Sequence, residues 1–304
     1  PKAKWYEYEP VDHDIHRRAA TKAFGLPVKP YYHLDKAERI LTLDCDFVGS
    51  EEDSHVFVRQ FAKGRKIDPA HPKMNRLYAV EALFTLTGAA ADHRLRVPAS
   101  SVHRVAAQIA AKVLTDPKFT SSQFAQMKEA VIAHGEAPDV QPLWISKCAD
   151  DLKAHAGRCL IMAGQGQSEA THLIALALNV ALGNINKTVS LRKVSANKSG
   201  SISDLAAALK SEGQTLVILG GNPVYDAPAD LEFADVVENA AQTIRLGYHE
   251  DESTPKSGWN IPQAHYLESW GDARTSDGTA VPVQPLIAPL FGGMTEIELL
   301  ARLA

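Results

Sequence analysis

The sequence is poor in cysteine and contains none of the cysteine spacings that hold metals locally. Its three cysteines, Cys45, Cys148 and Cys159, lie far apart and form no CxxC pair. A zinc or iron–sulfur site built from neighbouring ligands is therefore not expected. Cys45 and Cys159 fall in strand-like apolar runs, which predicts small core residues rather than ligands.

The chain also lacks a strong charge of either sign and a long apolar run. Its formal net charge is −4 over 304 residues, and its basic residues form no stripe, so nucleic-acid binding is not supported. No apolar run approaches the roughly twenty residues of a membrane span, and the opening PKAKWYEYEP resembles neither a signal nor a transit peptide. We expect a soluble chain, and a piece of a longer protein.

Catalytic motifs are missing as well. The twelve histidines form no HExxH pattern, and no GxSxG turn presents a serine. His13 and His16 share one side of a helix, which is most simply a solvated helix start. Asp44 and Asp46 follow a strand, where open sheets bind ligands, although Asp46 could equally shape the next turn. We therefore predict no catalytic and no metal-binding residue.

One stretch, residues 159–187, combines a strand, a glycine turn and a buried helix. Gly164 and Gly166 allow a tight turn, Ser168 is a natural N-cap, and apolar residues follow at helical spacing. Such a turn presents backbone N–H groups to a phosphate. The third glycine of a dinucleotide fingerprint is replaced by Glu169, and no acidic residue follows at the required distance, so NAD is not favoured. The alternative is that the glycines only close a βα unit.

A second turn, Gly220, Gly221, Asn222 and Pro223, follows a predicted strand at 215–219. This turn suits backbone recognition of a nucleotide or pterin, and a plain turn explains it equally.

Strand and helix signals alternate on both sides of a linker candidate at 135–142. They predict an α/β fold with two Rossmann-like parallel-sheet domains, residues 1–140 and 141–304, the second ending in an extended, proline-punctuated stretch from Trp259.

Four segments together resemble the molybdopterin oxidoreductases. They are AVEALFTLTGAAADHRLRVPASS at 79–101, MAGQGQSEATHLIALALNVALGNIN at 162–186, LGGNPVYDAPAD at 219–230 and the closing part at 264–304. Their order is the family's, and the resemblance covers nearly the whole chain. It implies two α/β domains like the central domains of that family. It also implies that Gly164, Gly166, Gly220, Gly221 and Asn222 match pterin-lining positions, here vestigial.

The departures from the family pattern suggest a cofactor-free relative. The amino-terminal cysteine cluster is missing, no cysteine or serine is identifiable as a molybdenum ligand, and Glu81 stands near the family's Asp-Pro-Arg element. Three segments closely resemble the iron–sulfur subunit of alternative complex III, a bacterial quinol oxidoreductase: LTGAAADHRLR, LGGNPVYDAP and HYLESWGDAR. In that subunit a molybdopterin-enzyme-like region without molybdenum precedes a ferredoxin-like domain that carries the clusters.

This resemblance implies a structural and docking region of a respiratory complex, without a cofactor or active site of its own. Iron–sulfur clusters are expected in a neighbouring domain. The implied partners are that ferredoxin-like domain, haem c subunits and integral membrane subunits on the periplasmic side of the inner membrane. The alternatives are a working molybdenum or tungsten enzyme fragment that binds molybdopterin guanine dinucleotide, and an unrelated nucleotide-binding α/β enzyme.

Overall fold

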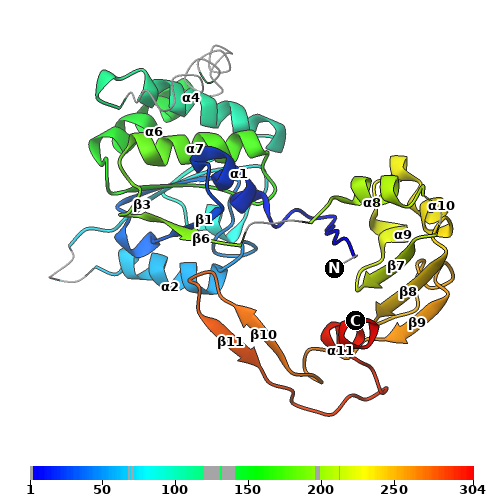
Figure 1. The fold of residues 1–304 in the computed structure, drawn as a ribbon. Coiled ribbons are helices and arrows are strands. Elements are labelled where there is room, and N and C mark those ends of the chain that lie inside the picture. The colour runs from blue at the N-terminus through cyan, green and yellow to red at the C-terminus, as the bar shows by residue number, and fades with distance from the viewer. Residues whose placement is uncertain are drawn as a thin grey trace. The chain divides into compact units, whose positions relative to one another are not determined.

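The computed structural model describes residues 3–67, 69, 72–119, 131, 141–195, 199–211 and 213–304. Its chain forms two compact units (Figure 1), the larger one Asp12–Ala196 and the smaller one Pro1–Val11 with Asn197–Ala304. The sequence also predicts a helix from residue 121 or 122 to 134, which lies almost wholly outside the described residues.

The larger unit is built on a parallel sheet with the strand order β4-β3-β2-β5. Its strands are β2 (Arg39–Leu43), β3 (Arg76–Glu81), β4 (His93–Arg96) and β5 (Cys159–Ala163). All five residues of β5 are buried, as its unbroken apolar sequence predicts for a strand that is covered on both faces. The predicted α/β class with parallel sheets is confirmed.

The compact units do not follow the predicted boundary between residues 140 and 141. Strand β5 lies beyond that boundary, yet it pairs with β2 in parallel, with Leu41 opposite Ile161. A division at residue 140 would therefore cut through one sheet. The turn and proline signals at 135–142 were local, whereas the partner of a strand is set by long-range packing.

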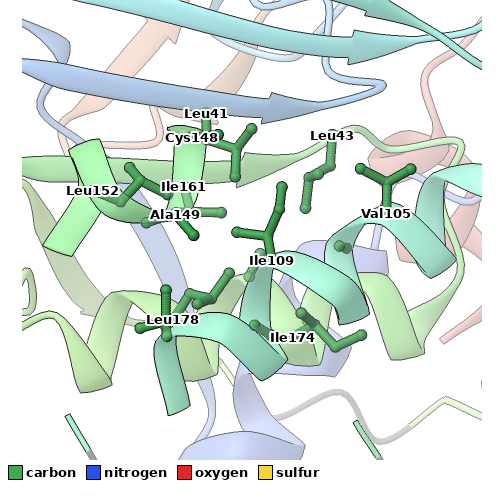
Figure 2. Packing of buried hydrophobic residues seen from close by; sticks show 14 of the residues in the cluster. Leu41, Leu43, Val105, Ile109, Cys148, Ala149, Leu152, Ile161, Ile174 and Leu178 are labelled. Atoms are coloured by element: carbon green, nitrogen blue, oxygen red, sulfur yellow. The ribbon is translucent and has the colours of Figure 1, made fainter. Parts of the chain in front are cut away.

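Helices cover both faces of this sheet. On one face, α4 (Val102–Leu114), α6 (Pro142–Ala154) and α7 (Glu169–Ala181) bury Leu41, Leu43 and Ile161, which point toward Ile109 and Leu178 in Figure 2. On the other face, Ile40, Leu77 and Leu160 pack with Phe57 and Phe61 of α2 (Ser54–Arg65). The alternation of strand side chains thus divides the core into two layers.

Two elements at the edge of the larger unit differ from expectation. The apolar run at 188–194 predicts a strand, and β6 (Val189–Lys193) is present. It pairs antiparallel with an unpredicted strand, β1 (Val28–Tyr32), in a separate sheet. Helix α1 (Ile15–Phe24) packs against β1 and α7. The alternation of residues 5–8 predicts a strand, and this prediction is wrong, because only Tyr6 forms a bridge, with Gly200.

The smaller unit has its own three-stranded parallel sheet, ordered β7-β8-β9. Its elements are α8 (Ile202–Ala208), β7 (Thr215–Leu219), α9 (Pro223–Asp226), α10 (Phe233–Glu238), β8 (Gln242–Gly247), β9 (Trp259–Pro262), β10 (Gly271–Arg274), β11 (Ala280–Val283) and α11 (Glu296–Leu303). Strands β10 and β11 form an antiparallel hairpin within the predicted extended stretch. No helix in the described part of the chain is long and apolar enough to span a bilayer.

Candidate functional site

The first predicted turn lies at the carboxyl end of β5, and its two glycines have different roles. A β-carbon on Gly164 would lie 1.8 Å from the backbone oxygen of Asp44, so the neighbouring segment after β2 leaves no room for a side chain. Asp44 itself has a φ of 52°, which few residues other than glycine adopt. A β-carbon on Gly166 would meet nothing within 4 Å. The chain's own packing, not a ligand, therefore requires glycine at position 164.

The amino end of α7 is already supplied with partners from this chain. The Ser168 hydroxyl accepts a hydrogen bond from the Thr171 backbone N–H at 3.4 Å, which confirms the predicted N-cap. The Glu169 carboxylate lies in the first turn and pairs with Lys22 at 2.6 Å. A carboxylate there interacts favourably with the helix dipole. The charge that a phosphate would bring is thus provided by Glu169.

Carboxylates also occupy the edge of the sheet beside this turn. Asp44 accepts hydrogen bonds from the Ala82 backbone at 3.2 Å and from the Gln167 amide at 2.9 Å. Asp46 accepts from both the backbone and the hydroxyl of Thr87, at 2.9 and 2.8 Å. These bonds connect loops that follow three different strands, so both aspartates hold the edge together. The turn-shaping role considered for Asp46 is the one that the structure supports.

A buried polar cluster next to the turn has no counterpart in the sequence predictions. The Glu51 carboxylate accepts from the Gln165 backbone at 3.0 Å and lies 3.4 Å from His16 Nε2. His172 Nε2 donates to the Gly164 carbonyl at 3.0 Å, and its ring meets that of His16 edge to face. Burial, together with the nearby His16, lowers the pKa of His172 to about 3, so its ring is neutral at physiological pH.

Sequence reasoning placed His16 on a solvated helix start, and that prediction is wrong. The side chain of His16 is only 11% exposed, whereas His13 is exposed and contacts Gln165 at 3.2 Å. Glu51 and His172 come from distant parts of the chain, and no spacing rule joins them to His16. The one signal in the sequence was His172, the single histidine of the apolar helix α7. A lone histidine of this kind does not identify the residues that it contacts.

Glu81 forms a buried ion pair at the end of β3. It is 3% exposed and accepts hydrogen bonds from Arg94 and from the Thr85 hydroxyl. A β-carbon on Gly88 would lie 1.7 Å from its Oε1, so the loop closes tightly over the carboxylate. Because a buried carboxylate needs such partners, Glu81 has a structural role here.

The second predicted turn lies at the carboxyl end of β7, in the smaller unit. Gly220 and Gly221 have φ values of 70° and 69°, which require glycine for conformational reasons. The Asn222 amide donates to Glu252 at 2.6 Å, and its carbonyl oxygen accepts from the Ser253 hydroxyl at 2.7 Å. The functional groups of Asn222 are therefore used to fix the 248–254 loop.

The acidic run at 249–252 is predicted from its charge to be exposed, but it is partly folded onto β8. Arg245, which is 4% exposed, pairs with Asp251 and donates to the His249 carbonyl at 3.0 Å. The predicted exposure therefore holds for His249, Glu250 and Glu252 but not for Asp251.

The residues around Gly164 do not fit a pterin dinucleotide. Its pyrophosphate would meet the carboxylates of Glu169 and Asp44 rather than free backbone donors.

The donor chemistry of a metal site is likewise not assembled. The described part of the chain holds no group of three or more histidine, cysteine, aspartate or glutamate side chains that could bind a metal ion. Burial raises the thiol pKa of Cys45 and Cys148, and that of Cys159 to about 12. All three cysteines are buried, as predicted for the two in strand-like runs.

The two α/β units together have a fold like that of a molybdopterin enzyme. The structure resembles acetylene hydratase from Pelobacter acetylenicus, a molybdopterin enzyme, with a TM-score of 0.69 and 12% identity over 94% of this chain. It also resembles the formyltransferase/hydrolase complex (FhcABCD) from Methylorubrum extorquens, solved with methylofuran, with a TM-score of 0.58 and 11% identity.

The matches differ in how much of each chain they cover. This chain spans 50% of the acetylene hydratase chain, whereas 95% of it matches 80% of the FhcABCD chain. No family model matches the sequence, and no curated protein matches it. At these identities the likeness establishes the fold alone.

Proposed function

We propose that this chain is a non-catalytic structural and docking region of an electron-transfer complex, built on a molybdopterin-enzyme-like fold. The observation that carries the proposal is the amino end of α7, where Ser168 and Glu169 take the place of an anionic ligand. The close contact between Gly164 and Asp44 further explains why glycine is retained without a pterin.

The finer proposal is the molybdopterin-enzyme-like region of an alternative complex III iron–sulfur subunit. Its support is the sequence resemblance at residues 86–96, 219–228 and 265–274. The partners would be a ferredoxin-like iron–sulfur domain, haem c subunits and integral membrane subunits, on the periplasmic side of the inner membrane.

Exposed apolar residues that lie close together in the sequence of the smaller unit, here called the apolar docking patch, are a further reason to propose protein contacts. We use this name for five residues with exposed fractions of 50 to 86%: Leu286, Ile287, Leu290, Phe291 and Ile297. Large exposed apolar groups of this kind are typical of surfaces that another protein covers.

The test is to purify the full-length tagged protein from its native membranes and to measure haem c and iron per chain. We expect both to co-purify, and Phe291→Asp to lower their ratio to the chain. Leu143→Asp is the matched control, because Leu143 is 71% exposed but lies on α6, outside the patch. Haem- and iron-free protein with an intact fold would contradict the docking role.

A second candidate function is binding of molybdopterin guanine dinucleotide. The carboxylates of Glu169 and Asp44 oppose it, and its support is the open space around Gly166 and the left-handed turn at Gly220 and Gly221. Saturable binding of this dinucleotide, weakened by Gly166→Asp but not by Gly278→Asp on the β10–β11 hairpin, would support it. Absence of pterin from the full-length native protein would reject it.

A further inference from the structure

A groove of about 1160 Å³ lies at the opposite edge of the larger unit's sheet, where the strands begin. Its wall includes Arg39 at the start of β2, Arg76 at the start of β3 and Arg158 just before β5. The segment after α2 contributes Lys66 and Lys73. The groove is therefore separate from the glycine turn, which follows the carboxyl end of β5.

Positive charge is concentrated in this groove. Among the described residues, seven lysine or arginine side chains line it against three aspartate or glutamate side chains, a balance of +4 with its histidine neutral, and Asp151, which pairs with two of the arginines from outside the lining, reduces this to +3. The chain as a whole carries −4. An acidic protein with one strongly cationic groove has the charge distribution that attracts an anion to that place.

The arginines of the groove are already paired, but its lysines are not. Arg39 and Arg76 both bind Asp151, at 2.7 and 2.8 Å, and Arg158 binds Glu38 at 2.8 Å. Within the described residues, none of the four lysines forms an ion pair, and all four are exposed: Lys36, Lys63, Lys66 and Lys73. Four ammonium groups thus remain available to a ligand.

A buried amide in the wall provides an independent observation. Asn75 is 5% exposed, and neither its amide nitrogen nor its oxygen has a hydrogen-bond partner in the described part of the chain. The side chain packs closely on Gly64, where a β-carbon would lie 2.4 Å from Asn75 Nδ2. Buried amide groups are nearly always hydrogen-bonded, and these two atoms have almost no accessible surface, so a ligand in the groove would pair with them only if the wall shifts.

We propose that this groove binds a small anion that carries several phosphate groups. Arginine forks suit carboxylates and phosphates alike, but here the arginines are engaged, so the free lysines, which bind phosphate as point charges, would provide the contacts. Apart from His155, no aromatic ring among the described residues lines the groove, so a stacked nucleobase is not part of the proposal. The site is independent of the proposed docking function.

The test is calorimetric titration of the whole chain with inorganic tripolyphosphate at low and high salt. Lys36→Ala combined with Lys66→Ala should weaken binding at least tenfold. The matched control, Lys193→Ala combined with Lys210→Ala, removes the same charge outside the groove and should leave binding within twofold. Equal weakening by both pairs, or no tripolyphosphate binding by the unmodified chain, would overturn the proposal.

Two further measurements sharpen the result. Asn75→Leu removes the unpaired amide, so we expect unchanged or higher thermal stability together with weaker tripolyphosphate binding. Unchanged binding by this variant would remove Asn75 from the site. Titration with poly-glutamate distinguishes the ligand class, because binding of that peptide without binding of tripolyphosphate would replace the phosphate ligand by an acidic protein segment.

Discussion

Replacing Gly164 by alanine distinguishes a structural glycine from a ligand-binding one. The new β-carbon would lie 1.8 Å from the Asp44 backbone oxygen and 2.7 Å from its carbonyl carbon. Neither atom belongs to a flexible side chain, so β5 or the loop after β2 must move. Overpacking of this kind costs about 3 kcal/mol. At about 2 to 4 °C per kcal/mol for a unit of this size, the melting temperature should fall by roughly 6 to 12 °C.

The assay is thermal unfolding of the ligand-free chain, followed by circular dichroism and calorimetry. Gly166→Ala is the matched control, because its β-carbon meets nothing within 4 Å and its φ is not positive. We expect that variant to unfold within about 1 kcal/mol of the unmodified chain. An unchanged melting temperature for Gly164→Ala would refute the packing argument and return Gly164 to the ligand-binding hypothesis.

Three other predictions concern the same unit. Ser168→Ala should destabilise the chain by about 1 kcal/mol in denaturant titrations, because it removes the cap of α7, and an unchanged midpoint would contradict the cap. Because the pKa of His172 is depressed to about 3, stability should be complete above pH 6.5 and fall by up to about 1.4 kcal/mol per pH unit toward pH 3. His172→Gln should flatten this dependence of stability on pH. An equally steep dependence in the variant would mean that His172 is not its cause. Burial raises the pKa of Asp151, but hydrogen bonds from Tyr78, Arg39 and Arg76 outweigh burial and hold that pKa below its usual value. The Asp151 carboxylate should therefore stabilise the fold above about pH 4, and this stabilisation should be lost as the pH falls below that value. Asp151→Asn should therefore destabilise at pH 7 and converge with the unmodified chain in acid; an equal loss at both values would mean that the charge is not responsible.

Local features of the fold could be predicted from the sequence. Strand β5, its glycine turn, the Ser168 cap and the length of α7 are all present, because apolar periodicity and capping act within one helical turn or one strand. The domain boundary was misplaced for the opposite reason. Strand β5 pairs with β2, which lies more than a hundred residues earlier, and nothing in either strand specifies that neighbour.

The candidate site shows the same division between local and long-range information. The glycines at 164 and 166 look equivalent in sequence, yet one is pressed against Asp44 and the other faces open space. The cluster of His16, Glu51 and His172 could not be predicted, because three separate segments bring these side chains together.

The most direct test of the central claim is the molybdenum, tungsten and pterin content of the full-length protein isolated from its native membranes. The account predicts neither metal nor pterin at a meaningful ratio to the chain, with haem c and iron present from its partners. Stoichiometric molybdenum or tungsten together with pterin would contradict it, and would mean that the turns at Gly164 and Gly220 hold a working cofactor.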